Sequence, residues 1–452
     1  MANDISALVA RSRAAQAQIA DYTQEQADAV VKVLAKAVYD NAEPLAKLAV
    51  EETRMGVYED KVQKNKGKAR IIWNGLKGKK SVGIIENLED EGVAIVAKPM
   101  GVVGAVTPCT NPVVTPMCNA MFALKGRNSI VVASHPRGRR CVEEIARLYY
   151  KELDRMGVPR DVFLYIEEPS VEATNALMRE SDVVIATGGM NMVKAAYSSG
   201  KPSFGVGAGN VQGIVGEDAD IPASVKRMVQ SRVFDNGIIC SGTQTVIAPR
   251  GKYAEIIAEF VRQGAYYTED PVQADAFRRA AFPGGAFNRD AVGQPASKLA
   301  ELAGVGVPDG TRLIIVKPEK YGEGELFSQE KMCPLMSSYE YGDWGEAVEI
   351  ARQNLMVEGA GHSVDLQTCD RANIEYAGLK LPVSRVLVNQ ICATMNGGAF
   401  ANSLSPTTTL GCGSWGNNSI SENLSYFHLI NKSRIVVEKK GWRQPPDDEI
   451  WA

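Results

Sequence analysis

The stretch SIVVASHPRGRRCVEEIARLYYKELDRMGVPRDVFLYI, residues 129–166, decides the fold class. Residues 129–133 form a short β-rich run, residues 140–156 follow a helical pattern, and residues 162–166 form a second β-rich run. Two strands joined by a helix of this length lie parallel in one sheet. We therefore predict a parallel sheet covered by helices in this part of the chain.

The alternation of strands and helices extends in both directions. Further β-rich runs lie at residues 93–97 and 182–186, and residues 171–179 follow a helical pattern. A second series begins after residue 240, with elements at residues 245–248, from about 253, and at 312–316, 344–355 and 386–389. The fold class is therefore α/β, and we expect two doubly wound units with helices on both faces of each sheet.

The first 75 residues have a helical pattern. Thr23 and Gln26 form a capping-box sequence, after which apolar residues recur at helical spacing from Ala27 to Val38. Residues 5–20 have two interpretations, an amphipathic targeting helix or a helix packed on the body of the protein. Since no Gly/Pro-rich linker follows them, we expect the packed helix.

Composition and charge exclude several classes of protein. The 452 residues are 45% hydrophobic and 23% charged, and the net charge of −3 gives no basic surface for nucleic acid. No apolar run approaches the ~20 residues of a membrane span. The three histidines, the lack of a Cys-x-x-Cys pair and the eight scattered cysteines disfavour a metal site and a disulfide framework. We expect a cytoplasmic protein with reduced thiols, no metal, and no nucleic-acid or membrane partner.

Cys240 lies in FDNGIICSGTQTVIA, residues 234–248. A turn-prone Asp-Asn-Gly leads into a short apolar run and the cysteine, and the small residues Ser241 and Gly242 follow it before a strand-like Thr-Val-Ile. Small neighbours leave the sulfur open to an incoming carbon atom, as a covalent nucleophile needs. The alternative is a buried thiol that acts as a small hydrophobic residue, and this segment alone does not decide between the two.

Two segments that follow strands carry polar side chains. In GAVTPCTNP, residues 104–112, Asn111 either aims its amide at an oxyanion or caps the next helix. After the strand at 129–133, the arginines of SHPRGRR, residues 134–140, either neutralise the 2′-phosphate of NADP or form a solvated basic turn. The residues alone leave both questions open.

Three glycine-rich or β-rich segments complete the pattern. Thr187-Gly188-Gly189 ends a strand and begins a helix, where free N–H groups attract phosphate, with a generic tight turn as the alternative. GVGAGN, residues 205–210, does not complete the dinucleotide fingerprint because its last glycine is absent. We expect LGCGSWGNNS, residues 410–419, to be an ordered loop at a site or subunit contact, and residues 434–438 to be an edge strand that pairs with another subunit.

Taken in order, these segments resemble the aldehyde dehydrogenase superfamily, and its CoA-acylating branch most closely. The resemblance covers essentially the whole chain. The motifs that carry it are Thr107-Pro108 with Asn111, His135-Pro136-Arg137, Thr187-Gly188-Gly189, Asn236-Gly237-Ile238-Ile239-Cys240, Glu330-Lys331-Met332-Cys333-Pro334, Glu358-Gly359-Ala360-Gly361-His362, and LGCGSWG at residues 410–416.

The resemblance implies an aldehyde-dehydrogenase fold, with two doubly wound α/β domains and a small β element for oligomerisation. Residues 1–230 would form the nucleotide-binding domain, including a bridging strand region near 85–100. Residues 231–410 would form the catalytic domain, and residues 411–452 would return to the nucleotide domain and the oligomer interface. The expected assembly is a homo-oligomer, either a dimer or a tetramer.

The resemblance also implies roles for single residues. Cys240 would be the nucleophile, Asn111 an oxyanion donor, and Glu330 a ligand of the nicotinamide ribose. The other cofactor-binding residues that it implies are Thr107, Pro108, His135, Pro136, Arg137, Thr187, Gly188, Gly189, Gly207 and His362, the last with a packing role as its alternative. The cofactor would be NADP, with NAD as the alternative, and coenzyme A would be the cosubstrate.

By this resemblance the acyl group is transferred to CoA and not to water. Hydrolytic relatives supply a glutamate base from a Glu-Leu-Gly-Gly motif, and the matching stretch here, residues 205–208, has glycine at that position. A thiol is a better nucleophile than water and needs no such base. The rival interpretations are a water-using aldehyde dehydrogenase and a non-catalytic nucleotide-binding scaffold.

The closest resemblance is to acylating dehydrogenases for sulfoacetaldehyde and succinate semialdehyde, both short aldehydes with an anionic group. Many relatives carry a glutamate three residues after the nucleophile, where this chain has Thr243. Loss of that negative charge lowers the repulsion of an anionic substrate. We expect sulfoacetaldehyde, with succinate semialdehyde and acetaldehyde as alternatives, and the predicted substrate contacts are Ser241, Thr243 and Arg385.

Overall fold

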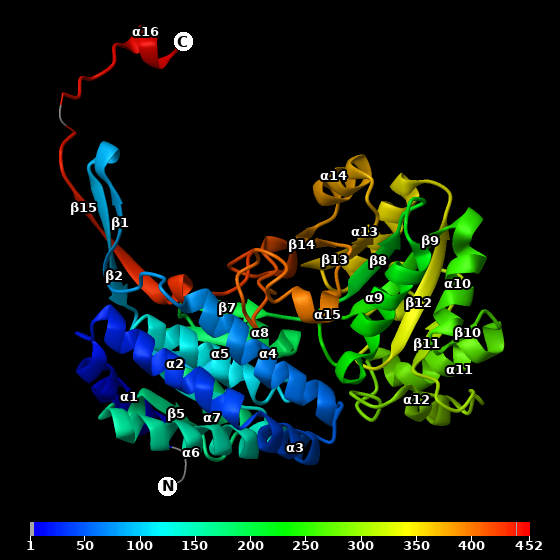
Figure 1. Cartoon of the computed structure of the whole chain (residues 1–452), viewed down its shortest axis with the longest axis horizontal. Coiled ribbons are helices and arrows are strands. Elements are labelled where there is room, and N and C mark those ends of the chain that lie inside the picture. Colours follow the sequence, from blue (N-terminus) through cyan, green and yellow to red (C-terminus); the bar gives the residue numbers. More distant parts are fainter. Residues whose placement is uncertain (1–3, 440) are drawn as a thin grey trace.

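The computed structural model describes residues 4–439 and 441–452 and has two α/β lobes and a projecting arm (Figure 1). The sheet of the first lobe has the strand order β5-β4-β3-β6-β7, and all of its neighbouring strands are parallel. Its strands are β3 (Val102–Thr107), β4 (Ser129–Ser134), β5 (Phe163–Tyr165), β6 (Val183–Thr187) and β7 (Ser203–Val206). The strand order reverses at β3, which creates a crevice at the carboxyl ends of β3 and β6 where such folds bind ligands.

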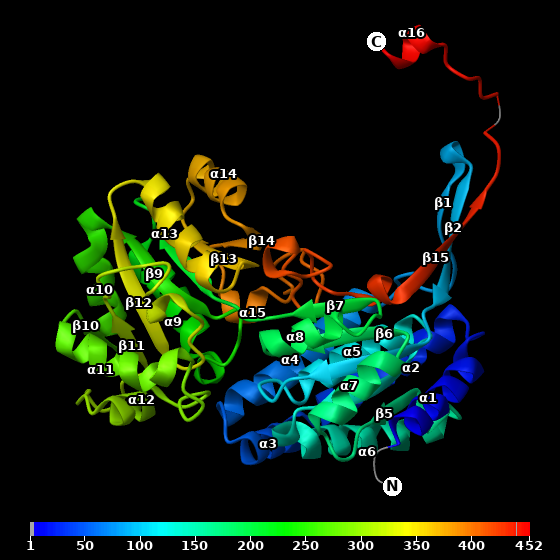
Figure 2. The ribbon, with the colours of Figure 1, turned by 180° about the vertical axis from the view of Figure 1, so that it is seen from behind.

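Helices cover both faces of this first sheet. One face packs on α2 (Gln24–Asp40), α5 (Val114–Lys125) and α6 (Arg139–Met156), with α3 (Ala42–Thr53) and α4 (Tyr58–Leu76) outside them. The other face packs on α1 (Ile5–Ile19), α7 (Val171–Glu180) and α8 (Met190–Tyr197), which are seen from behind in Figure 2. Alternate residues of β3 enter the two cores, Val103 on one side and Val102 on the other, as the pleat of a strand requires.

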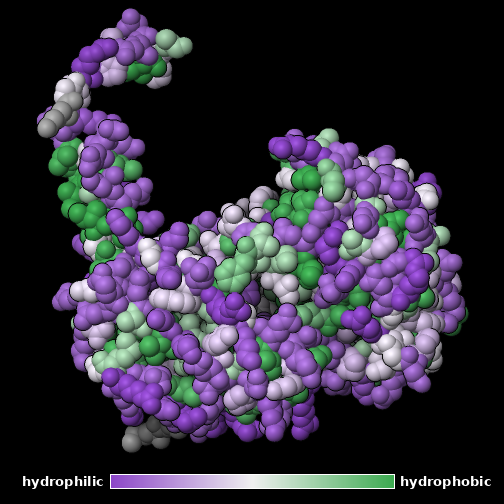
Figure 3. All heavy atoms as spheres, viewed as in Figure 1, coloured by the Kyte–Doolittle hydropathy of each residue, from purple (hydrophilic) through white to green (hydrophobic). Residues whose placement is uncertain are grey.

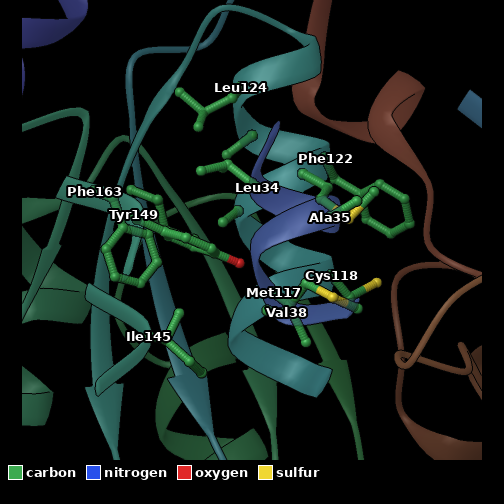
Figure 4. Packing of buried hydrophobic residues seen from close by; sticks show 14 of the residues in the cluster. Leu34, Ala35, Val38, Met117, Cys118, Phe122, Leu124, Ile145, Tyr149 and Phe163 are labelled. Carbon is green, nitrogen blue, oxygen red and sulfur yellow. The ribbon is translucent and has the colours of Figure 1, made fainter. Parts of the chain in front are cut away.

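The core of the first lobe is closely packed between α2, α5 and α6 (Figure 4). Leu34, Val38 and Phe122 all belong to this cluster, and the rings of Tyr149 and Phe163 pack edge to face with centroids 5.0 Å apart. The predicted capping box at Thr23 is present at the start of α2. The prediction that residues 5–20 form a packed helix is also confirmed, because the buried side chains of α1 join the core on the first sheet.

The sheet of the second lobe has seven parallel strands in the order β10-β11-β12-β9-β8-β13-β14. They are β8 (Val211–Val215), β9 (Thr243–Pro249), β10 (Ala265–Thr268), β11 (Leu313–Val316), β12 (Leu335–Tyr341), β13 (Gly361–Gln367) and β14 (Val383–Val388). The helices are α9 (Ile221–Val233), α10 (Tyr253–Arg262), α11 (Pro271–Ala281), α12 (Ala296–Ala303), α13 (Trp344–Val357), α14 (Arg371–Lys380) and α15 (Cys392–Met395). The chain passes from the carboxyl end of β7 directly to the amino end of β8, so these two sheet edges face each other.

The arm is an antiparallel three-stranded sheet in the order β1-β2-β15. Its strands are β1 (Gly83–Leu88), β2 (Val93–Pro99) and β15 (Ile430–Val436), and α16 (Asp447–Ile450) lies beyond it. Apolar side chains at Ile84, Ile435 and Val436 are exposed along the arm (Figure 3). Among the described residues, no helix combines the length and the apolar character needed to cross a membrane.

Two sequence-based placements differ from the structure. The run at 93–97 belongs to the arm and not to a parallel sheet. Strand β8 and helix α9 belong to the second lobe, so the passage between the lobes lies at residues 207–210 and not at 230. The predicted edge strand at 434–438 is present as β15, which pairs with β2 on one side, with Arg434 and Val436 in register with Ile95 and Val93. Pairing of its other side with a second subunit stays a prediction.

Candidate active site

A cavity of about 360 Å³ lies between helix α4 of the first lobe and loops of the second lobe. Cys240 and Asn111 both line it, although they come from different lobes. The remaining walls come from α4, from Ser241 beside the cysteine, and from two loop segments, 393–400 and 407–410. The structure therefore brings the predicted nucleophile and the predicted oxyanion donor to one cavity.

A tight turn presents Cys240 at the amino edge of the second sheet. Asp235, Asn236 and Gly237 have φ values of 52°, 52° and 70°, so three successive residues adopt the left-handed conformation. Such a run is strained for non-glycine residues and persists only where surrounding contacts hold it. The buried guanidinium of Arg232 supplies some of these contacts, because it donates to the carbonyl oxygens of Gly237 (3.2 Å) and Cys333 (3.0 Å).

Asp235 is fully buried and pairs with two lysines of α4. Its carboxylate accepts hydrogen bonds from Lys61 Nζ at 3.0 Å, Lys64 Nζ at 2.5 Å and the backbone N–H of Val57 at 2.8 Å. The two lysines hold the pKa of Asp235 below its usual value, although burial opposes them. Since an unpaired buried charge is costly, this contact fixes the turn before Cys240 against α4.

Lys64 also fixes the orientation of the Asn111 side chain. Its ammonium group donates to Asn111 Oδ1 at 2.8 Å, and an ammonium group cannot accept a hydrogen bond, so the oxygen of the amide must face the lysine. The amide nitrogen of Asn111 then faces away from Lys64, and it has no hydrogen-bond partner in the described part of the chain. This nitrogen is available to donate to an oxyanion in the cavity.

Cys240 is partly accessible, and its thiol is held in the protonated form. Burial and, to a smaller extent, the negative charge of Glu330 raise the pKa of Cys240 to about 12, whereas Arg385 acts in the opposite direction. The chain at Gly209 runs directly against the cysteine, since a Cβ there would lie 2.0 Å from the Cys240 carbonyl oxygen. A nucleophilic role therefore requires that the thiolate form at the moment when its partner arrives.

Glu330 does not line the cavity; it contacts Gly209, which packs against Cys240. Its carboxylate accepts from the Gly209 N–H at 3.1 Å, and burial together with Glu358 raises the pKa of Glu330 to about 8. Its own backbone N–H donates to Glu358 at 2.7 Å. Close to neutral pH Glu330 is therefore partly neutral and partly charged. Its role as a ligand of the nicotinamide ribose stays a prediction.

The charged side chains on the wall of the cavity are all cationic. Lys64, Lys68 and Arg70 line it, and none of the described lining residues is acidic. Lys68 Nζ donates to the carbonyl oxygens of Gly397 at 2.9 Å and Thr407 at 3.2 Å, and burial lowers the pKa of Lys68 to about 8. At neutral pH the cavity therefore carries net positive charge.

The carboxyl edge of the first sheet has the features of a nucleotide site. Thr107 Oγ1 and Ser134 Oγ, at the ends of β3 and β4, are buried without a hydrogen-bond partner among the described residues. Gly188 and Gly189 leave open space at the start of α8. Unpaired buried hydroxyl groups are costly, so these positions fit a ligand with polar groups of its own.

The other predicted nucleotide residues lie along the same edge. Pro108 follows β3 directly, and the His135 ring accepts from the Arg137 N–H at 3.1 Å, which forms a short 3-10 turn with Pro136. The Arg137 guanidinium donates to the Thr53 carbonyl oxygen. Because of this bond, the Arg137 guanidinium is neither free to bind a phosphate nor fully solvated, so neither of the two predicted roles fits it as it stands. Gly207 lies against Met190, because a Cβ there would be 2.1 Å from its sulfur.

Only one of the three predicted substrate contacts lies on the wall of the cavity. Ser241 lines the cavity, where its hydroxyl group donates to the Ala393 carbonyl oxygen at 3.2 Å. Thr243 is buried in the second sheet and donates to Asp365 at 2.8 Å, and Arg385 is buried and donates to the carbonyl oxygens of His362 and Gly411, each at 2.8 Å. Thr243 and Arg385 are therefore not part of the cavity lining.

His362 lies on β13, fully buried near the loop that contains Cys412. Burial lowers the pKa of His362 to about 3, and its Nε2 atom has no hydrogen-bond partner in residues 4–439 and 441–452. The ring is therefore neutral, with one nitrogen free to meet a ligand. Within the same ranges, no group of three or more His, Cys, Asp or Glu side chains is arranged to hold a metal ion.

Sequence reasoning missed Lys64, Lys68, Arg70 and Asp235. The available signal was the spacing of Lys61, Lys64 and Lys68, three and four residues apart, which places them on one face of a helix. Lys61 and Lys64 are buried there and Lys68 is partly buried. Charged residues at such spacing are normally on a solvated face, which is why the pattern alone did not indicate a site.

The chain is similar to known proteins along its whole length. Residues 1–283 match the model of the aldehyde dehydrogenase family. The chain belongs to the aldehyde dehydrogenase family. It is 50% identical to the succinate-semialdehyde dehydrogenase (acetylating) of Clostridium kluyveri, with 100% of both chains covered. It is also 36% identical to the sulfoacetaldehyde dehydrogenase (acylating) of Bilophila wadsworthia, with 98% of this chain and 96% of that one covered.

A solved structure supports the fold as well. The acetylating aldehyde dehydrogenase from Geobacillus thermoglucosidasius superposes with a TM-score of 0.93 at 36% identity, covering 98% of this chain and 97% of that one. The aldehyde-dehydrogenase fold that the sequence predicted is confirmed. The chain is an oxidoreductase that acts on aldehydes, a CoA-acylating aldehyde dehydrogenase that uses NAD(P).

The surroundings of Cys240 predict how its reactivity depends on pH. With a thiol pKa of about 12, the rate of Cys240 alkylation by iodoacetamide should rise roughly tenfold per pH unit between pH 6 and 8. Above pH 8 the rise should slow, because Glu330 then carries its charge, and a Glu330→Gln variant should lose this bend. Peptide mass spectrometry measures the rate, with the exposed Cys369 as an internal reference. An alkylation rate that reaches a plateau below pH 8 would contradict the raised pKa of Cys240, since the thiolate would already be formed.

Proposed function

We propose that this enzyme oxidises a short anionic aldehyde to its acyl-CoA through a thioester on Cys240. The observation that carries the proposal is the charge of the cavity, which has three cationic side chains and, among the described residues, no acidic one on its wall. The cations favour an anionic substrate. The lack of a carboxylate leaves no base to activate water, which favours a thiol as the acceptor.

The proposed chemistry uses two residues of the cavity directly. The Cys240 thiolate adds to the aldehyde carbon, and the resulting oxyanion accepts hydrogen bonds from Asn111 Nδ2 and from the Cys240 backbone N–H. Loss of hydride leaves an acyl group bound to the Cys240 sulfur as a thioester. The CoA thiolate then attacks that carbonyl carbon and Cys240 departs as the thiolate, so the reaction is reversible.

NAD(P) supplies the hydride acceptor when it is bound. We propose that Thr107, Pro108, the His135-Pro136-Arg137 turn and Thr187 to Gly189 hold it at the carboxyl edge of the first sheet, with Gly207 and Glu330 toward the cysteine. The unpaired Thr107 and Ser134 hydroxyl groups support this site. NADP is the proposed preference, because the exposed Arg139 and Arg140 also follow β4, whereas the Arg137 guanidinium is hydrogen-bonded to the Thr53 carbonyl oxygen. His362 is proposed as a CoA contact because of its free Nε2.

Two substrates fit an anionic aldehyde, succinate semialdehyde and sulfoacetaldehyde. The identity of 50% to an enzyme named for the first, against 36% to one named for the second, favours succinate semialdehyde. This reverses the order expected from the sequence, where Thr243 supported the sulfonate. Thr243 is buried beside Asp365 and does not line the cavity, so its lack of charge gives no evidence about the substrate.

We further propose that the enzyme is a homo-oligomer. The arm projects from the first lobe with exposed Ile84, Ile435 and Val436, and β15 is an edge strand of its sheet. Exposed apolar strands of this kind are normally covered by a partner. A second copy of the chain is the simplest cover.

The Lys64–Asn111 contact predicts a specific effect on the chemical step. A Lys64→Met variant should lower kcat by roughly 10- to 100-fold, because the amide of Asn111 loses its fixed orientation while Asp235 keeps Lys61. Lys66→Met is the matched control, since Lys66 is on the same helix but pairs with Glu43 at the surface. Steady-state kinetics with urea denaturation as a folding check measure the effect. Equal kcat values for both variants would contradict a positioning role for Lys64.

The acceptor is tested by the dependence of turnover on CoA. With succinate semialdehyde and NADP, we expect sustained NADPH formation with CoA and only a burst of about one equivalent without it. Cys240→Ala should abolish turnover and leave nucleotide binding, measured by calorimetry, nearly unchanged. Full turnover without CoA would support a water-using enzyme. A Cys240→Ala variant with undiminished activity would remove the covalent mechanism.

A further inference from the structure

Three of the cationic groups of the cavity lie on one helix, α4, and they are not equivalent. Lys64 is committed to Asp235 and Asn111, so its charge is already paired. Arg70 is exposed at the rim and forms no ion pair with the part of the chain that the structure describes. Lys68 lies between these two environments. It is partly buried, has no acidic partner among the described residues, and is held by two carbonyl oxygens.

The head group of Lys68 has one donor left over. An ammonium group has three N–H donors, and the carbonyl oxygens of Gly397 and Thr407 accept two of them. These two carbonyls belong to the loops that form the opposite wall of the cavity, so they hold the ammonium group at a fixed place. A charged donor that is held in position and still lacks an anion is a binding site for one.

Lys64 and Lys68 are one helical turn apart on α4, and both side chains line the cavity. Four residues of α-helix rise about 6 Å, and side chains at this spacing are neighbours on the same face. The Lys64 end of this interval is the Asn111 amide, where the oxyanion of the reacting aldehyde would be held. The Lys68 end lies about one turn away along the same wall.

We propose that Lys68 binds the terminal anion of the substrate, and that its fixed position favours a four-carbon aldehyde with a terminal carboxylate over a shorter anionic aldehyde. This inference rests on the proposed function and assigns a residue to its specificity. Arg70, at the rim, attracts the anion toward the cavity but does not hold it in the reacting position.

The two candidate aldehydes differ in how far their anionic group lies from the aldehyde carbon. In succinate semialdehyde three carbon–carbon bonds join the aldehyde carbon to the carboxylate carbon, about 4 Å when extended, and roughly 6 Å between the outer oxygen atoms. In sulfoacetaldehyde only two bonds join the aldehyde carbon to sulfur, about 2.7 Å. The longer chain therefore carries its anion farther from the Asn111 amide, in the direction of the cavity wall that holds Lys68.

Lys68→Gln is the variant that tests this assignment. Glutamine keeps an N–H donor for the carbonyl oxygens of Gly397 and Thr407 and removes the charge. The measured quantity is the ratio of kcat/KM for succinate semialdehyde to kcat/KM for butyraldehyde, which has the same number of carbons and no charge. We expect this ratio to fall about 100-fold, mainly through KM, because loss of a buried charged contact costs roughly that factor. Both values come from one preparation, so the ratio does not depend on the fraction of folded enzyme.

Lys66→Met and Arg70→Gln complete the series. Lys66→Met should leave the ratio unchanged, because Lys66 pairs with Glu43 away from the cavity. Arg70→Gln should lower it less than Lys68→Gln and should lose the salt dependence of kcat/KM for the anionic aldehyde. An unchanged ratio in Lys68→Gln, or a larger fall in Arg70→Gln, would overturn the assignment.

A binding measurement on the wild-type enzyme gives a second test that does not need turnover. Succinate should protect Cys240 from iodoacetamide, butyramide should not, and the protection should be lost in Lys68→Gln. In the wild type, kcat/KM for succinate semialdehyde should exceed that for sulfoacetaldehyde and for malonate semialdehyde. If the enzyme acylates CoA with all of these aldehydes equally, the Lys68 assignment fails and the proposed acylation stands. If none of them acylates CoA, the proposed function itself fails.

Discussion

The buried carboxylate of Asp235, held between Lys61 and Lys64, is the contact on which the site depends. It joins a turn of the second lobe to helix α4 of the first, and both charged partners are removed from solvent. Separating them would leave a charge in the interior, so the two lobes are fixed where they meet. Cys240 follows five residues after Asp235, and Lys64 also holds Asn111. One ion cluster thereby fixes the nucleophile of one lobe and the amide of the other at the same cavity.

Most of the fold could be predicted from local pattern. The β-rich runs and helical stretches that the sequence indicated correspond to β4, β5, β6, α6 and α7 within one or two residues. The resemblance implied a bridging strand region near 85–100 and a small β element, but the local pattern did not show which strands of the arm pair, because a short apolar run has the same pattern in a parallel or an antiparallel sheet. Strand β2 pairs with β15, which is more than 300 residues away in the chain. The passage between the lobes was also placed too late, since β8 is a short strand with a buried glutamine and glycine and gives little signal.

The site could be predicted where chemistry and position coincide in one segment. Cys240, Asn111 and Ser241 lie in loops at sheet edges, and all three line the cavity. Arg385 was proposed for its charge, but its position on β14 directs that charge to carbonyl oxygens of the chain. Lys68 was missed because its neighbours in the sequence look like an ordinary charged helix surface. Its environment is created by loops at residues 397 and 407, more than 300 residues later.

The proposed thioester on Cys240 is tested most directly by the mass of the Cys240 peptide after the enzyme is mixed with succinate semialdehyde and NADP in the absence of CoA. We expect this peptide to gain one succinyl group, in an amount that matches the NADPH formed. Added CoA should remove the succinyl group as succinyl-CoA. An unmodified Cys240 peptide in enzyme that has nevertheless produced NADPH would contradict the account.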